Sequence, residues 1–202
     1  AAKAIEASKR PVLYVGGGAI IYGASEEVRE LAAKNEIPVT MTLLGLGSFP
    51  QTHELSLGML GMHVTAYANH AIMESDLIVA IGARFDDRVT GKLEAFAPHA
   101  KVIHIDIDPS SVSKNVAVDI PIVGDAKNIL EKLNKIIKKP DTREWLKRIE
   151  EWKKQFPLHY RDDDKVHPQY IIEEIWKATK GEAIITTEVG QNALKAKVGA
   201  KA

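Results

Sequence analysis

The segment LIVAIGARFDDRVTG, residues 77–91, begins with five apolar residues and runs through a glycine into two arginines and two aspartates. An apolar run of this length, without polar alternation, is typical of a strand that is buried on both faces. Such strands belong to parallel sheets that are covered by helices. The charged residues follow the carboxyl end of the predicted strand, which is the edge where open parallel sheets bind ligands.

Similar apolar runs of strand length recur along the chain. They are rich in Val and Ile and cover Pro11–Val15, Ile37–Thr42, Lys101–Asp106, Ile120–Val123 and Ala183–Thr187. Helical periodicity is found over Ser25–Lys34, His63–Met73, Ala126–Ile137, Thr142–Phe156 and Gln169–Thr179. The alternation of strands and helices predicts an α/β fold with a parallel sheet between helices.

Composition narrows the class of protein. The 202 residues include 27 Lys and Arg, 27 Asp and Glu, and no cysteine. A formal charge of zero argues against nucleic acid or a polybasic membrane surface as a partner. The lack of cysteine excludes disulfides and thiolate chemistry. Because no apolar run approaches the roughly 20 residues that cross a bilayer, and no secretion signal is visible, we expect a cytoplasmic location.

Gly16-Gly17-Gly18 follows the first predicted strand and is similar to a nucleotide-binding turn. Glycine lets a phosphate approach the backbone amides closely. The dinucleotide spacing G-x-G-x-x-G fails, since Ile21 stands where the third glycine is required. A plain tight turn between strand and helix therefore remains an equal alternative.

The charged residues after the strand at 77–81 are a more specific signal. Arg84, Asp86, Asp87 and Arg88 place permanent cations and hydrogen-bond acceptors where phosphates and sugar hydroxyls could be held. The alternative is a surface network in which these four residues pair only with one another.

Catalytic and metal motifs are weak. His63 could bind a ligand or serve only the start of its helix, and together with His70 it lacks a third metal ligand at a convincing spacing. No G-x-S-x-G nucleophile motif occurs. Asp86 and Asp87 lie beside two arginines, so both should stay ionised. We therefore predict no catalytic and no metal-binding residue in this chain.

Seven strings, taken in order and spacing, resemble the central domain of the acetolactate synthase family of thiamine-diphosphate enzymes. They are YVGGG (14–18), TLLGLGSFP (42–50), ELSLGMLGMH (54–63), ANHA (68–71), GARFDDRVTGKLEAFAP (82–98), KVIHIDIDPS (101–110) and VGD (123–125). The resemblance extends from about Ala1 to Gln191. It implies a three-layer, Rossmann-like fold with a six-stranded parallel sheet that holds FAD, whose flavin performs no net redox chemistry in acetolactate formation.

The resemblance also implies which residues contact FAD. Those that match the family's motifs are Gly17, Thr42, Leu43, Met62, His63, Gly82, Arg84, Asp86, Arg88, Asp106, Ile107, Gly124 and Asp125. We expect Gly17 near the phosphates, Met62 and His63 near the flavin, and the last four residues around the adenosine.

The same resemblance divides the chain into three parts. Residues 1–140 match the FAD-binding domain, 141–167 form a connecting segment, and 168–202 contain the start of the thiamine-diphosphate domain. Residues 192–202, NALKAKVGAKA, do not match the family, and the first residues have mid-helix composition. We therefore expect this chain to be a piece of a longer protein.

Family members condense two pyruvates, or pyruvate and 2-oxobutyrate, with loss of CO₂ in branched-chain amino-acid synthesis. Their cofactor-activating glutamate and G-D-G motif have no counterpart here, so thiamine diphosphate and Mg²⁺ would belong to the parent, and this piece would be inactive alone. The implied partners are the remaining domains, further copies of the parent in a homo-oligomer and a small regulatory subunit. Two alternatives stay open: a spacer or dimerisation module that binds no nucleotide, and the domain of a related flavin enzyme such as pyruvate oxidase or glyoxylate carboligase.

Overall fold

The computed structural model describes residues 1–61, 65–160 and 166–186. One sheet contains the strands β1 (Pro11–Val15), β2 (Val39–Met41), β3 (Ser56–Met59), β4 (Leu77–Ile81), β5 (Lys101–Asp106) and β6 (Ile120–Val123). Their order is β3-β2-β1-β4-β5-β6, and every neighbouring pair is parallel. The chain reverses its direction of travel across the sheet between β1 and β4, where parallel sheets open a crevice for ligands.

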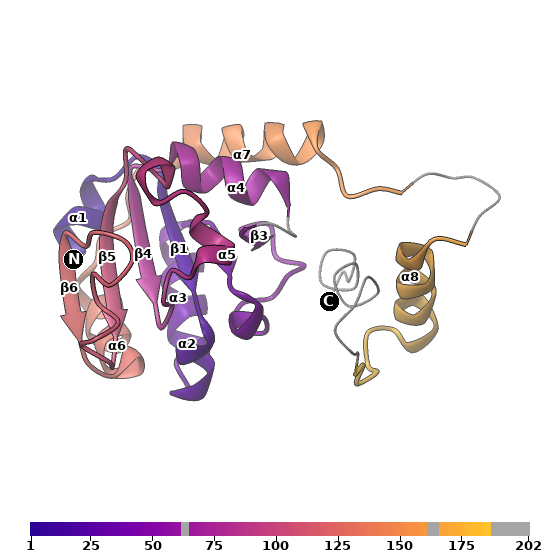
Figure 1. Cartoon of the computed structure of the whole chain (residues 1–202), viewed down its shortest axis with the longest axis horizontal. Coiled ribbons are helices and arrows are strands. Elements are labelled where there is room, and N and C mark those ends of the chain that lie inside the picture. Colours follow the sequence, from indigo (N-terminus) through magenta and orange to yellow (C-terminus); the bar gives the residue numbers. More distant parts are fainter. Residues whose placement is uncertain (62–64, 161–165, 187–202) are drawn as a thin grey trace.

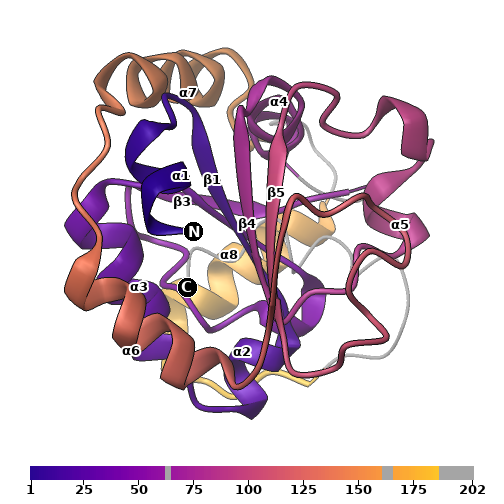
Figure 2. The ribbon, with the colours of Figure 1, turned by 90° about the vertical axis from the view of Figure 1, so that its left-hand side faces the viewer.

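Helices cover both faces of this sheet, as Figures 1 and 2 show. The helices α1 (Ala2–Ala7), α3 (Ser25–Asn35) and α6 (Ala126–Ile136) pack on one face. The helices α4 (Ala66–Glu74) and α7 (Arg143–Gln155) pack on the other. Each strand of the centre is buried on both sides, since alternate residues join the two cores. The predicted three-layer α/β fold is thereby confirmed.

Short helical segments follow three strands directly at their carboxyl ends. They are α2 (Gly17–Ile21) after β1, the 3₁₀ turn η1 (Leu43–Gly45) after β2, and α5 (Asp87–Thr90) in the loop after β4. A second 3₁₀ turn, η2 (Leu93–Ala95), follows α5. These segments surround the edge at which the sequence predicts a ligand.

One predicted strand is wrong. Ala183–Thr186 form no strand, and Ile184 is 96% exposed; Thr187 lies outside the described residues. The sheet instead contains β3, Ser56–Met59, which was not among the predicted strands. A β-branched run becomes a strand only when it finds a hydrogen-bonding neighbour. Ser56–Met59 has such a neighbour in β2, which overrides its weak strand composition.

The segment predicted to connect two domains contains α7, which packs on the sheet. Trp145, Ile149 and Trp152 are each 3% exposed, so the helix predicted over Thr142–Phe156 is present and buries its apolar side against the sheet. The indole Nε1 of Trp145 donates to the carbonyl oxygen of Pro11 at 3.1 Å, and its ring meets that of Trp152 edge to face at 5.6 Å. The core on this face thus depends on residues beyond 140.

The last described helix, α8 (Pro168–Thr179), buries none of its residues. Its apolar side chains Tyr170, Ile171, Ile175 and Trp176 are partly exposed to solvent. Figure 1 shows α8 standing apart from the sheet. Over the described ranges, no helix combines the length and the apolar character needed to cross a membrane.

Candidate functional site

A cavity of about 810 Å³ opens at the carboxyl edge of the sheet, over the ends of β1, β2, β4 and β5. This volume lies within the range of roughly 300–1,000 Å³ found for small-molecule sites. Eight of the residues predicted to contact FAD line it: Gly17, Thr42, Leu43, Gly82, Arg84, Asp86, Arg88 and Asp106. Residues that are 89 positions apart in the sequence therefore meet around one cavity.

Three predicted residues are not in the lining. Ile107 directly follows β5, and Gly124 and Asp125 follow β6, the strand at the edge of the sheet. The Asp125 carboxylate accepts a hydrogen bond from the Asn128 amide at 2.9 Å and so caps α6. Met62 and His63 lie outside the described residues. Contact of all thirteen residues with FAD stays a prediction.

Close packing explains all three glycines of the turn: a Cβ on Gly17 would lie 2.8 Å from the Leu44 Cβ, and the other two glycines approach the loop after β4. A Cβ on Gly16 would lie 2.0 Å from the carbonyl oxygen of Gly82, and one on Gly18 would lie 2.8 Å from the Gly82 Cα. The Gly18 amide donates to that same carbonyl at 3.2 Å. The tight-turn interpretation thus accounts for Gly16 and Gly18, because the loops after β1 and β4 touch backbone to backbone.

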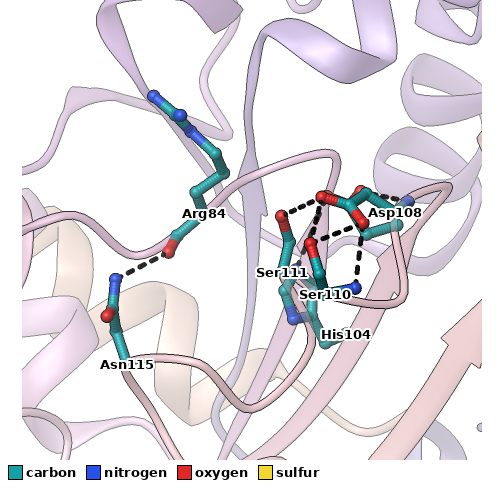
Figure 3. A network of polar contacts seen from close by, with 7 residues as sticks. Arg84, His104, Asp108, Ser110, Ser111 and Asn115 are labelled. Atoms are coloured by element: carbon teal, nitrogen blue, oxygen red, sulfur yellow. Dashed lines mark hydrogen bonds and ion pairs between the residues drawn. The ribbon is translucent and has the colours of Figure 1, made fainter.

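Arg84, Asp86, Asp87 and Arg88 are all exposed. No ion pair joins any two of these four residues. Among the described residues, no group forms a hydrogen bond with the guanidinium group of Arg84 or of Arg88. This observation disfavours the self-contained surface network. The side chain of Asn115 donates from Nδ2 to the carbonyl oxygen of Phe85 at 2.9 Å. It also donates to that of Arg84 at 3.3 Å, the bond drawn in Figure 3. The backbone of the arginine loop is therefore held, while its cations remain available to a ligand.

An aromatic residue anchors the same loop in the core. Tyr14, Ala80 and His104 form one row across β1, β4 and β5. The Phe85 ring packs over this row, 5.3 Å from the ring of Tyr14 and 5.4 Å from that of His104. Sequence analysis missed this role; the signal was a lone aromatic residue inside a charged loop. Because Phe85 is 2% exposed, its burial sets where the neighbouring Arg84 and Asp86 emerge.

Two further polar groups of the lining were also missed. Burial raises the pKa of the Tyr14 phenol far above its ordinary value, and the charge of Asp86 adds to this effect, so Tyr14 is a neutral hydrogen-bonding group. Hydrogen bonds from Ser110 and Ser111 lower the pKa of Asp108, the ionised centre of the turn drawn in Figure 3. Asp108 lies two residues beyond the end of β5, in a strand ending where the strand-edge rule predicts a site, although it was not among the residues predicted to contact FAD.

The cavity offers two kinds of chemistry in one place. Arg84 and Arg88 match a diphosphate, since guanidinium groups bind phosphate oxygens through paired hydrogen bonds. Asp86, Asp106 and Asp108 can accept hydrogen bonds from sugar hydroxyls. Apolar lining from Leu43, Leu44, Met59 and Leu60 suits a flat ring. In the part of the chain that the structure describes, no three metal-ligating side chains converge.

Comparison with known proteins matches the part of the chain that contains the cavity. The family described as "Thiamine pyrophosphate enzyme, central domain" matches residues 1–133. The chain is 44% identical over 200 residues to "Acetolactate synthase isozyme 3 large subunit" of Escherichia coli, covering 95% of this chain and 35% of that protein. It is 50% identical over 202 residues to "Probable acetolactate synthase large subunit" of Methanocaldococcus jannaschii, covering 95% and 34%. The identity to "Acetolactate synthase 1, chloroplastic" of Zea mays is 48% over 192 residues, covering 92% and 30%. The chain spans about a third of the length of these relatives.

Proposed function

Because this chain belongs to the thiamine pyrophosphate enzyme central-domain family, we propose that it is the FAD-holding central domain of an acetolactate synthase large subunit. One observation carries the proposal. Arg84, Arg88 and Asp106, drawn from two neighbouring strands, line a single cavity at the point where the strand order reverses. That position and those charges suit a dinucleotide better than a single anion.

Each part of the cavity would hold a different part of FAD. Arg84 and Arg88 would bind the diphosphate, with the backbone of Gly17 close by. Asp106 would accept hydrogen bonds from ribose hydroxyls, and Leu43 would pack along the ribityl path. In acetolactate formation the bound flavin supplies no net redox chemistry, so the role of these residues is to bind and orient.

The proposal extends to the protein in which this domain acts. It would condense two pyruvates, or pyruvate and 2-oxobutyrate, with loss of CO₂, using thiamine diphosphate and Mg²⁺ held by other domains. We propose the cytoplasm as its location, and further copies and a small regulatory subunit as its partners. Residues 1–140 together with α7, which packs on the sheet, would form the FAD domain; the rest of 141–167 would be the connection and 168–202 the start of the thiamine-diphosphate domain. The 202-residue chain alone would form no acetolactate.

A titration of the 202-residue chain with FAD, followed by flavin fluorescence, tests the binding. We expect Arg84→Gln and Arg88→Gln each to weaken binding about tenfold, since hydrogen bonds to charged groups contribute roughly 1.5–3 kcal/mol. Arg143→Gln is the matched control, because Arg143 pairs with Asp141 outside the cavity and should leave the dissociation constant unchanged. No FAD binding by wild type would favour the spacer alternative, and equal binding by all four proteins would exclude Arg84 and Arg88 as ligands of the diphosphate.

A product assay on the full-length parent distinguishes the related flavin enzymes. Acetolactate is the expected product from pyruvate. Hydrogen peroxide would indicate a pyruvate oxidase instead, and tartronate semialdehyde from glyoxylate would indicate a glyoxylate carboligase. Either result would leave the FAD site intact and overturn the proposed reaction.

A further inference from the structure

His104 is a buried polar side chain that the site has so far left unused. It lies in the middle of β5 and is 1% exposed. Neither ring nitrogen makes a hydrogen bond of good geometry within residues 1–61, 65–160 and 166–186, although a backbone group of Ala83 lies near enough to act on the ring. An unsatisfied buried polar group destabilises the folded state, so its presence needs a reason.

The charged group nearest to this imidazole belongs to the cavity. Nε2 of His104 lies 3.7 Å from Oδ2 of Asp106, beyond hydrogen-bond range but close enough for a small rotation to close the gap. The other carboxylate oxygen, Oδ1, accepts the Asp108 amide at 2.9 Å. Asp106 therefore has one oxygen fixed by the backbone and one that faces His104.

The surroundings of the ring favour its neutral form. Burial lowers the pKa of His104, and the neighbouring Asp106 together with the backbone hydrogen-bonding group of Ala83 offsets this only in part. Phe85 meets the ring edge to face at 84°, and no cation from the described residues contacts it. A neutral imidazole carries one N–H and one acceptor nitrogen, and a carboxylate neighbour favours the hydrogen on the facing nitrogen.

We propose that His104 is a positioning residue, whose Nε2–H turns toward Oδ2 of Asp106 and holds that carboxylate ready for the hydroxyl groups of the cavity's ligand. The inference rests on the proposed function, because the ribose of FAD supplies those hydroxyls. A carboxylate held in place before binding loses less freedom when the ligand arrives, which strengthens binding.

Fluorescence titration of the 202-residue chain with FAD compares wild type with His104→Leu, His104→Gln, Asp106→Ala and the double variant His104→Leu/Asp106→Ala. We expect His104→Leu to weaken binding about tenfold, the size of one hydrogen bond to a charged group. His104→Gln, which keeps an N–H donor, should recover most of this loss. In the Asp106→Ala background, His104→Leu should have less than a twofold effect, because coupled residues are not additive.

Urea unfolding of each variant separates binding from stability. Unchanged binding by His104→Leu, equal losses in the Leu and Gln variants, or additive effects in the double variant would overturn the inference. If His104→Leu does not fold, the Gln variant and the spectroscopic test below decide.

A second readout does not depend on FAD. Proton–nitrogen NMR correlation of the imidazoles, assigned with His104→Gln, should show the Nε2–H tautomer for His104 and a shift of its resonances in Asp106→Ala. An Nδ1–H tautomer, or resonances indifferent to Asp106→Ala, would refute the contact. Failure of wild type to bind FAD would refute the proposed function, while the NMR result would still decide the role of His104.

Discussion

At the scale of single residues, close approach of two backbones shapes the site. Gly82 has φ of +57°, and a Cβ there would lie 2.7 Å from the Gly18 Cα. Gly23 has a similar φ of +64° with nothing within 4 Å of such a Cβ. A comparison of alanine variants at these two positions separates backbone strain from steric contact, because an alanine meets the same strain at both.

We predict that Gly23→Ala lowers the free energy of unfolding by about 1–2 kcal/mol, the cost of a left-handed residue with a side chain. Gly82→Ala should lose clearly more, since the loops after β1 and β4 must also separate. It should weaken FAD binding too, whereas Gly23→Ala should not. Urea unfolding and flavin titration measure both effects, and equal losses of stability would contradict the importance of the loop contact.

The buried imidazole of His104 gives the stability a dependence on pH. Burial lowers its pKa below the ordinary value of 6.5, while Asp106 beside it opposes the shift in part and Tyr14 in the same row is neutral. The unfolded chain takes up a proton near the ordinary pKa, before the folded chain does. Between the two pKa values the unfolded state binds more protons, so the free energy of unfolding falls as the pH decreases below about 6.5.

We therefore expect the urea midpoint of wild type to be lower at about pH 5.5 than at about pH 7.5. His104→Gln should reduce this difference. His99→Gln is the control, because His99 is exposed, and it should retain the wild-type difference. A difference that is unchanged in His104→Gln would assign the pH dependence to other groups.

At the scale of elements, a side-chain cap on the first turn of α6 fixes where this helix begins. The Asp125 carboxylate accepts the Asn128 amide, although the sequence predicts the same residue to contact FAD. We expect Asp125→Ala to cost about 0.5–2 kcal/mol of stability and Asp125→Ser to cost much less, since serine also caps helices. Calorimetry measures this cost. A loss of FAD affinity in the stable Asp125→Ser variant would establish the ligand contact as well.

The helix α7 carries a large share of one core. Trp145→Ala removes a buried ring and leaves the Pro11 carbonyl without its partner, so we predict a loss of about 3–5 kcal/mol in the free energy of unfolding. Trp145→Phe should lose less, because it keeps most of the ring. Lys147→Ala, on the exposed side of the helix, should change stability by less than about 0.5 kcal/mol. Similar losses for Trp145→Ala and Lys147→Ala would show that α7 does not support the core.

The elements that were predictable from sequence are those whose pattern matches their burial. Pro11–Val15 and Leu77–Ile81 are apolar throughout and have both faces covered, so local pattern and tertiary environment agree. Ser56–Met59 was missed because pairing with β2, rather than its composition, makes it a strand. A strand was overpredicted at Ala183–Thr186 because a β-branched run does not reveal whether a pairing strand exists.

The same distinction holds for the site. Arg84, Asp86 and Asp106 were found because a strand's end is visible in sequence and the fold brings such ends together. Phe85 and His104 were not, since their roles arise from a row that crosses three strands. Which residues lie side by side across a sheet depends on the strand register, and the sequence of one strand does not determine that register.

At the scale of the whole molecule, the structural unit extends past the predicted boundary at 140. We expect a chain ending at residue 158 to unfold as cooperatively as the full chain, because α8 buries no residue. A chain ending at 140 loses Trp145, Ile149 and Trp152, whose burial contributes roughly 1.5–3 kcal/mol each. That sum rivals the total stability of about 5–15 kcal/mol of a domain, so this shorter chain should be largely unfolded. Circular dichroism during urea unfolding measures both, and a cooperative 1–140 chain would refute this boundary.

The meeting of Gly16 and Gly18 with Gly82 means that closely packed main chain forms part of the cavity lining. Substitutions among the side chains that line the cavity can then change which ligand binds without moving this backbone. Domains that descend from such an ancestor are free to differ in the ligand they bind while the fold stays the same.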